Sequence, residues 1–337
     1  MNAESGRLGV IHLRRLWANW TNKRKSLPTA PDPKNTPAND AAVFDGLGLL
    51  IEETIRHIMQ SAPTFDQFEQ WTLEKNGGSV EPQRVDRINA MTEGREYGEE
   101  TKRALREIEE MEPALSAEDL AFFDQNGYVV LHEAVSPDQC RAAEQAIWEF
   151  LGQDPNDPES WHADKTSIFV PLYHHPALWA NRRSKRIHKA YSQLWGTADL
   201  WPLVDRVSLN PPERGAWRFP GPQLHWDVSL IPPLGFGVQG LLYLTDTALH
   251  QGAFTCVPGF HKKVDDWLRS LPPGVDPREQ DLLSLGTTPV AGHAGDLILY
   301  HQGLPHGGSP NRATRPRIVQ FLDYVPPRRF VHATRWR

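Results

Sequence analysis

Hydrophobic residues in the first third of the chain recur at three- and four-residue spacings, which is the pattern of amphipathic helices. One such stretch spans residues 43–62, and a second begins after Pro63 and ends at residues 76–78, Asn-Gly-Gly. A third, strongly charged stretch covers residues 99–112 and ends before Pro113. Residues 1–115 are therefore predicted to form a helical N-terminal region, whose Phe and Trp residues we interpret as core.

The first 25 residues are rich in Arg and Lys and contain one acidic residue, Glu4. This composition is typical of a transit peptide or of an amphipathic helix, and the lack of an apolar run excludes a secretory signal. The helix is favoured because the apolar positions recur at helical spacing. These positions are Val10, Ile11, Leu13, Trp17 and Trp20. Residues 28–39 hold four prolines and predict a loop.

The pattern changes at Ser116, a plausible N-cap for a short helix over residues 117–123. Helices are also expected over residues 136–150 and 182–195. Short apolar runs separated by Gly and Pro dominate after Leu203, which is typical of strands. The expected strands are residues 127–131, 167–173, 203–209, 222–229, 238–245, 253–257, 295–300 and 317–325. This pattern predicts a mainly β domain over residues 116–337, built from antiparallel strands with flanking helices.

Composition fits a folded, soluble protein, since hydrophobic residues make up 39% and charged residues 23% of the 337 positions. A net charge of −6 gives no reason to expect nucleic acid or an anionic membrane as a partner. No apolar run is long enough to span a membrane. The two cysteines, Cys140 and Cys256, are too few for a disulfide framework, and we expect them to be buried in a cytoplasmic protein.

A candidate metal site begins with His225-Trp226-Asp227 in the expected strand 222–229. Alternate residues of a strand point to the same face, so the imidazole of His225 and the carboxylate of Asp227 would lie together. They supply two of the three ligands of a two-histidine, one-carboxylate metal site. The pair alone is weak evidence, because a surface His-x-Asp is common.

A second histidine stands 81 residues later in His306-Gly-Gly-Ser-Pro-Asn311. Eleven residues after His306, Arg317 leads into the apolar strand 318–322. An arginine at the start of a buried strand requires a carboxylate, which its planar guanidinium binds with two hydrogen bonds. A diacid that chelates the metal at its other end would supply one. His301 competes with His306, but the glycines and the spacing to Arg317 favour His306.

Four segments together resemble the phytanoyl-CoA dioxygenase family of iron(II)- and 2-oxoglutarate-dependent oxygenases. They are residues 123–131 (FDQNGYVVL), the His225-x-Asp227 pair, residues 252–262 (GAFTCVPGFHK), and residues 306–311 with Arg317. The resemblance covers about residues 116–325 and leaves the first 115 unexplained. Two positions depart from the family pattern: Gly308 stands where a serine is frequent, and Phe260 replaces a serine.

The resemblance implies a double-stranded β-helix, also called a jelly-roll or cupin-like core. It implies that His225, Asp227 and His306 bind iron(II), that Arg317 binds the far carboxylate of 2-oxoglutarate, and that O2 is consumed with release of succinate and CO2. Expected further contacts to the co-substrate are Gln223, Tyr243 and Ser309. Expected contacts to the substrate are Trp217, Arg218 and Trp226. Because Asp227 is present, hydroxylation is favoured over halogenation.

Two other classes of protein remain open at this point. A cupin-type hydrolase or isomerase could use the same metal ligands as a Lewis acid, and a jelly-roll could keep the site without catalysis. The first does not explain Arg317, and the second is disfavoured because all three ligands and Arg317 are present. The expected substrate is a small organic molecule with an anionic group, but its identity, the oxidative outcome, the oligomeric state and the role of residues 1–115 are not readable from the sequence.

Overall fold

The computed structural model describes residues 6–27, 33–34, 36–162, 166–221 and 223–327. Its chain forms two compact units. The first contains the residues up to 111 together with 197–204 and 325–327, and the second contains residues 112–196 and 205–324. The sequence placed a single boundary at residue 115 and did not predict that residues 197–204 join the N-terminal unit. Of the predicted loop 28–39, residues 28–32 and 35 lie outside the described residues, and residues 37–39 are helical instead, because Thr36 caps a helix that begins at Pro37.

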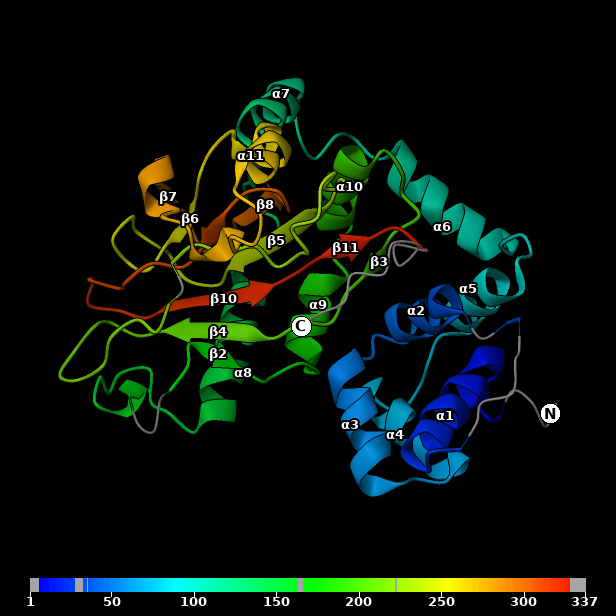
Figure 1. Ribbon diagram of the computed structural model, residues 1–337. Coiled ribbons are helices and arrows are strands. Elements are labelled where there is room, and N and C mark those ends of the chain that lie inside the picture. The colour runs from blue at the N-terminus through cyan, green and yellow to red at the C-terminus, as the bar shows by residue number, and fades with distance from the viewer. Residues whose placement is uncertain (1–5, 28–32, 35, 163–165, 222, 328–337) are drawn as a thin grey trace. The chain divides into compact units, whose positions relative to one another are not determined.

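Helices build the first unit (Figure 1). They are α1 (Ile11–Arg24), α2 (Pro37–Gly46), α3 (Ile51–Ser61), α4 (Phe65–Lys75), α5 (Pro82–Glu93) and α6 (Glu99–Glu110). Their apolar faces form a core that includes Leu13, Leu16, Ile58 and Phe68. The helix predicted near the N-terminus is therefore confirmed as α1. Helix α5 was missed because its sequence is mostly polar, although Pro82 at its start and a left-handed Gly94 at its end are helix boundary signals.

The second unit combines sheets with helices. Its helices are α7 (Ala117–Asn126), α8 (Pro137–Leu151), α9 (Pro176–Arg182), α10 (Lys185–Trp195) and α11 (Val264–Ser270). Ser116 caps α7 in a reciprocal arrangement with Asp119, as its sequence position predicts. The expected helix 182–195 corresponds to α10, which begins after Ser184 because the Ser184 hydroxyl caps it.

Strands of the described residues form antiparallel sheets. The larger has the order β1-β8-β5-β10-β4-β2. Its strands are β1 (Tyr128–Leu131), β2 (Phe169–Val170), β4 (Val207–Asn210), β5 (Val238–Tyr243), β8 (Leu297–His301) and β10 (Arg317–Phe321). A smaller sheet has the order β7-β6-β9, from Thr288–Val290, Phe254–Cys256 and His306–Gly307. The short β3 (Trp201–Pro202) pairs with β11 (Tyr324–Val325).

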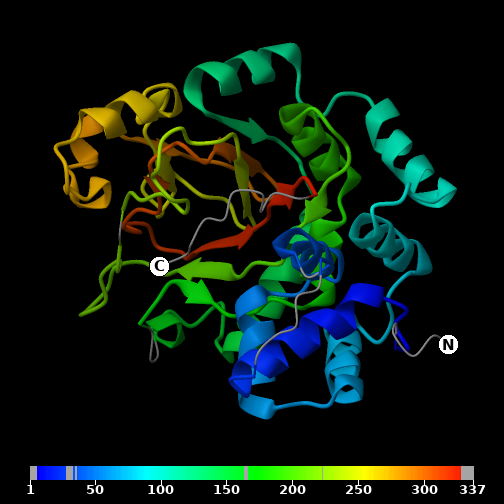
Figure 2. The ribbon, with the colours of Figure 1, turned by 45° about the vertical axis from the view of Figure 1, so that its right-hand side comes forward.

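The two larger sheets enclose one core. It contains Leu241, Tyr243, Ile298 and Val319 from the six-stranded sheet and Phe254, Cys256 and Val290 from the three-stranded sheet. The opposite face of the six-stranded sheet packs on helices, where Tyr191 of α10 donates to the carbonyl of Leu322 and Asn181 of α9 donates to Gln320. Figures 1 and 2 show α9 and α10 along this side of the strands. Alternation along β5 and β10 thus decides which side chains face the space between the sheets.

The strand predicted over residues 222–229 is wrong. Within it, only His225 makes a strand-like bridge, and the described neighbours are bends or irregular. The alternation of burial nevertheless persists, because Leu224 and Trp226 are buried while His225 and Asp227 are partly exposed. A period of two therefore fixed the orientation of these side chains without a regular ladder of hydrogen bonds.

Among the described residues, no helix is both long and apolar enough to cross a membrane. Cys140 and Cys256 are both free thiols in buried positions, as expected. Burial raises the pKa of Cys140 to about 11 and that of Cys256 to about 12, so neither forms a thiolate at neutral pH.

Gly240→Ala should destabilise the second unit. A methyl group at this position in the central strand β5 would lie 2.3 Å from the hydroxyl of Tyr191 and 2.4 Å from the carbonyl oxygen of Leu322. Overpacking of this kind costs about 1–3 kcal/mol. Thermal unfolding followed by circular dichroism should show a lower melting temperature. Gly235→Ala, where nothing lies within 4 Å, is the matched control and should unfold like the wild type; equal melting of both variants would contradict the packing described here.

Candidate metal and co-substrate site

Two backbone hydrogen bonds bring the candidate histidines together. The amide of His225 donates to the carbonyl of His306 at 2.8 Å, and the amide of His306 donates to the carbonyl of His225 at 3.0 Å. The close approach requires glycine at position 307, because a Cβ there would lie 2.0 Å from the carbonyl oxygen of Gln223. This bridge fixes the imidazoles side by side, with ring centroids 4.8 Å apart.

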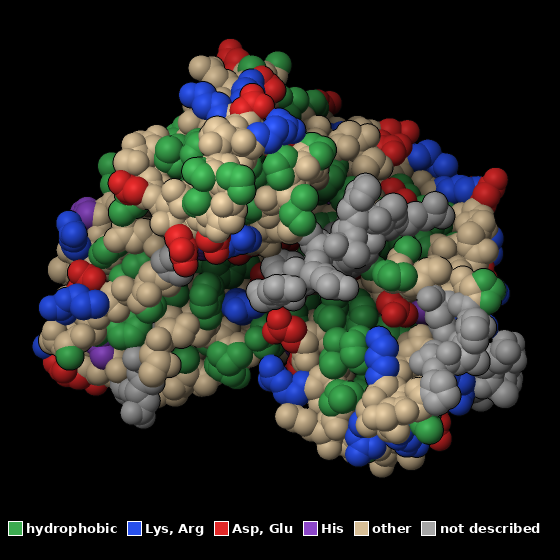
Figure 3. Space-filling view, in the orientation of Figure 1, with side chains coloured by type: hydrophobic (Ala, Val, Ile, Leu, Met, Phe, Trp, Pro, Cys, Tyr) green, Lys and Arg blue, Asp and Glu red, His purple; other side chains and the backbone are tan. Residues whose placement is uncertain are grey.

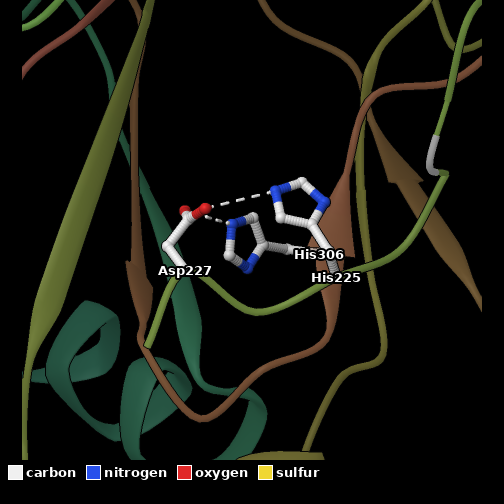
Figure 4. A group of neighbouring side chains, drawn as sticks. All are labelled: His225, Asp227 and His306. Atoms are coloured by element: carbon white, nitrogen blue, oxygen red, sulfur yellow. Dashed lines mark hydrogen bonds and ion pairs between the residues drawn. The ribbon is translucent and has the colours of Figure 1, made fainter. Parts of the chain in front are cut away.

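Asp227 completes a group of three potential ligands, shown in Figure 4. Its Oδ1 lies 3.4 Å from Nε2 of His225, and its Oδ2 lies 3.2 Å from Nε2 of His306. One nitrogen or oxygen atom from each residue lies within 4.8 Å of the others. His306 is buried, whereas His225 and Asp227 are partly exposed, so the group opens on one side. Two imidazoles and one carboxylate are a donor set that suits iron(II).

Neighbouring groups orient these ligands. Nδ1 of His306 lies 3.0 Å from the carbonyl oxygen of Leu304. Because a carbonyl only accepts, Nδ1 carries the proton and Nε2 is the nitrogen available for a metal. The rings of Tyr300 and Phe254 lie 4.5 Å and 6.0 Å from the His306 ring, centroid to centroid, and enclose it.

The carboxylate of Asp227 is ionised in this setting. Burial acts to raise its pKa, but the interactions of the carboxylate with the imidazoles of His225 and His306 outweigh burial and hold the pKa far below its ordinary value. Gln239 of β5 also donates from Nε2 to Oδ2 of Asp227 at 2.8 Å. A deprotonated carboxylate is the form that binds a metal cation.

Arg317 at the start of β10 is a buried cation without a counter-ion. It is 2% exposed, its Nη2 donates to the Ser208 hydroxyl at 3.1 Å, and its Nε has no hydrogen-bond partner among the described residues. Within that part of the chain no carboxylate lies at ion-pair distance, and burial lowers the pKa of Arg317 to about 10, so it stays charged at neutral pH. A buried guanidinium with unused donors suits an anionic group supplied by a ligand. Arg182 is equally buried and its Nε also has no hydrogen-bond partner among the described residues, but its Nη1 and Nη2 donate to the carbonyls of Tyr173 and Asp205.

The other predicted co-substrate contacts are less suitably placed. The Tyr243 hydroxyl donates to the carbonyl of Val290 at 2.7 Å and accepts from the amide of Phe254 at 2.9 Å, so it links the two sheets instead of facing a ligand. The Ser309 hydroxyl donates to the carbonyl of Ala253 at 3.1 Å. Gln223 is exposed, and its backbone packs on Gly307.

Of the predicted substrate contacts, one is buried in the core and the other two lie in an irregular segment. Trp226 is 3% exposed in the core and donates its indole N–H to the carbonyl of Gly303, so it cannot stack on a substrate. Trp217 and Arg218 lie in the irregular segment after β4. Arg218 is exposed and donates to the carbonyls of Gly215 and Trp217, and the Trp217 ring packs edge-on to His162.

His301, the competitor of His306, lies outside the group of ligands. Its Nδ1 accepts from the amide of Gly303, and its ring packs on His261 and Phe236. Gln239 and Ser208 were not predicted. A signal existed for Gln239, because an inward Tyr243 implies an inward Gln239 four residues earlier on the same strand. Ser208 reaches Arg317 only through the pairing of β4 with β10, which the sequence did not reveal.

Comparison with known proteins identifies the family of this chain. The family model for phytanoyl-CoA dioxygenase (PhyH) matches residues 123–319, which is more than half of the chain. The chain therefore belongs to the phytanoyl-CoA dioxygenase family. Members are iron(II)- and 2-oxoglutarate-dependent oxygenases, and this protein is a dioxygenase of that class, with iron(II), 2-oxoglutarate and O2 as its requirements.

Individual relatives are distant. An ectoine dioxygenase of Sphingopyxis alaskensis is 25% identical over 237 residues, covering 62% of this chain and 76% of the relative. One of Nocardia farcinica is 25% identical over 270 residues, covering 71% and 87%. The crystal structure of EctD from S. alaskensis with 2-oxoglutarate and 5-hydroxyectoine matches with a TM-score of 0.47 at 25% identity, covering 64% of this chain and 77% of that one.

Gly307→Ala should weaken metal binding without removing any ligand. The added methyl group must displace the backbone at Gln223 and, with it, His225 from His306. We expect the affinity for iron(II) to fall by about tenfold or more, the range found when the supports of metal ligands are lost. Anaerobic titration against a competing chelator measures this affinity. Gly235→Ala again serves as the control, and an undiminished affinity in Gly307→Ala would show that the bridge does not position the ligands.

Proposed function

We propose that His225, Asp227 and His306 bind iron(II), that Arg317 binds the far carboxylate of 2-oxoglutarate, and that the enzyme hydroxylates a small organic molecule. The unpaired charge of Arg317 carries this proposal. A buried guanidinium with an unused Nε, whose Nη1 lies 3.7 Å from a Cβ built at Gly308, two residues after His306, matches a ligand that is an anion at one end and a chelator at the other. We further propose that the two sheets form a double-stranded β-helix.

Iron(II), when bound, supplies the chemistry that activates O2 with 2-oxoglutarate, releasing succinate and CO2. The residues of the chain bind, orient and shield. His306 and Asp227 are held by Leu304 and Gln239, so their ligand atoms are oriented before the metal arrives. The rings of Phe254 and Tyr300 keep water from the buried side of His306.

Arg317 also argues against a hydrolase or isomerase that uses the metal alone, because such an enzyme gives no reason to keep a buried cation without a counter-ion. Substrate contacts by Trp217 and Arg218 remain predictions. Both lie in the segment that leads to His225, and the ring of Phe219 in this segment lies close to Gly308.

Alanine at His225 or at Asp227 should abolish turnover. Each change removes one of the three ligands, so we expect 2-oxoglutarate-dependent succinate formation to fall by more than about 100-fold. Succinate formation and O2 consumption measure the effect. His301→Ala is the matched control, since this neighbouring histidine lies outside the ligand group and its loss should leave the rate near that of the wild type. Full turnover in both ligand variants would refute the assignment.

Arg317→Leu should act on the co-substrate and leave the metal site intact. It removes two charge-assisted hydrogen bonds to a carboxylate, so the KM for 2-oxoglutarate should rise at least about 100-fold. Arg317→Lys keeps the charge but not the planar pair of donors and should give an intermediate KM. Steady-state kinetics at saturating iron(II) measures both values. A KM equal to that of the wild type would mean that another residue binds the diacid.

A further inference from the structure

Gln239 presents one unused hydrogen-bond acceptor beside the candidate metal ligands. Its Nε2 donates to Oδ2 of Asp227 at 2.8 Å. Because an ionised carboxylate only accepts, the amide cannot rotate by 180° without losing this bond. Oε1 is therefore fixed on the side away from Asp227, where it is buried and has no hydrogen-bond partner among the described residues.

A buried acceptor without a partner is unfavourable unless a ligand supplies a donor. The residue opposite Gln239 in the sheet is Tyr300 of β8, whose side chain faces the same side. For the Tyr300 hydroxyl, too, no hydrogen bond exists within the described residues, although the residue is only 3% exposed. Two polar groups thus face the space next to His306 with unused hydrogen-bonding capacity.

Two aromatic side chains, Phe321 and Phe169, lie further along the sheet face that carries Gln239. Leu241, the next inward residue of β5, lies opposite Phe321 of β10. Spacings within a sheet place the backbones of Gln239 and Phe321 roughly 8 Å apart. The Phe321 ring packs against that of Phe169 from β2, with centroids 5.9 Å apart. Phe169 is 45% exposed, and the guanidinium of Arg206 lies 5.2 Å from its centroid. Figure 3 shows hydrophobic side chains lining a hollow over β10 and β4.

We infer that the substrate is a ring compound with an O–H or N–H group, which donates to Oε1 of Gln239 while the ring packs on Phe321 and Phe169. The inference rests on the proposed function, since it places the substrate beside the metal of that site. Such a site selects its substrate by a hydrogen bond. An analogue without the donor leaves Oε1 of Gln239 buried and unpaired, and the site therefore rejects it. Selection by a hydrophobic pocket alone would be much weaker.

The test uses two naphthalene probes, 2-naphthol, which has an O–H donor, and 2-methoxynaphthalene, in which a methyl group replaces that hydrogen. The full chain is loaded with manganese(II) and 2-oxoglutarate, and binding is read from the paramagnetic relaxation of probe protons, which reports both affinity and closeness to the metal. In the wild type, 2-naphthol should bind about tenfold more tightly than the ether, the contribution of one hydrogen bond. The isosteric Gln239→Met should lower this preference to less than about twofold.

Phe169→Ala should weaken both probes by about fivefold, because the exposed ring packs on either naphthalene. The matched control is Phe150→Ala, since Phe150 is a 50% exposed phenylalanine on α8 and its loss should change neither affinity. Equal binding of the two probes to the wild type, no relaxation of either probe, or equal effects of Phe169→Ala and Phe150→Ala would overturn the inference.

A second measurement separates this inference from the proposed function. The iron(II)–2-oxoglutarate charge-transfer absorption is recorded anaerobically for each variant at saturating metal. Its absence in the wild type would refute the proposed function itself. Its presence, together with a wild type that does not prefer 2-naphthol, would leave the proposed function standing and refute only the substrate class.

Discussion

The reciprocal backbone hydrogen bonds between His225 and His306 are the constraint on which the site depends. They join an irregular segment to the short strand β9, so two histidines 81 residues apart in the chain become neighbours. Side-chain interactions alone would leave the imidazoles free to separate. With the backbones locked, the remaining ligand, Asp227, needs only the two-residue spacing that places it on the same face.

Around this bridge each of the two sheets supplies different residues of the site. The six-stranded sheet supplies Arg317 and Gln239, and the three-stranded sheet supplies His306 together with Phe254 behind it. Tyr243 holds the sheets at a fixed separation, because its hydroxyl bonds the backbone of both β6 and β7. The distance from the proposed metal ligands to Arg317 is thus set by the two sheets.

Much of this arrangement was accessible from the sequence, because it depends on local rules. Helical periodicity, the Ser116 cap and the apolar runs predicted most elements, and a period of two placed His225 and Asp227 together. What failed depended on partners remote in the chain. The hydroxyls of Tyr243 and Ser309 were predicted to reach a co-substrate, yet they donate to the backbone carbonyls of Val290 and Ala253, which are remote in the chain. Trp226 was predicted to contact the substrate but belongs to the core, on the face opposite to His225 and Asp227.

The isolated charge of Arg317 has a consequence for the end of the reaction cycle. Succinate retains the carboxylate that Arg317 would hold in 2-oxoglutarate and loses the keto group that chelates the metal. In that proposed role Arg317 would attract product and co-substrate alike, and only the metal end of the site would distinguish them. Release of succinate is then opposed, because it leaves a buried cation without an anion. Exchange of one diacid for the other, instead of simple departure, satisfies that charge throughout turnover.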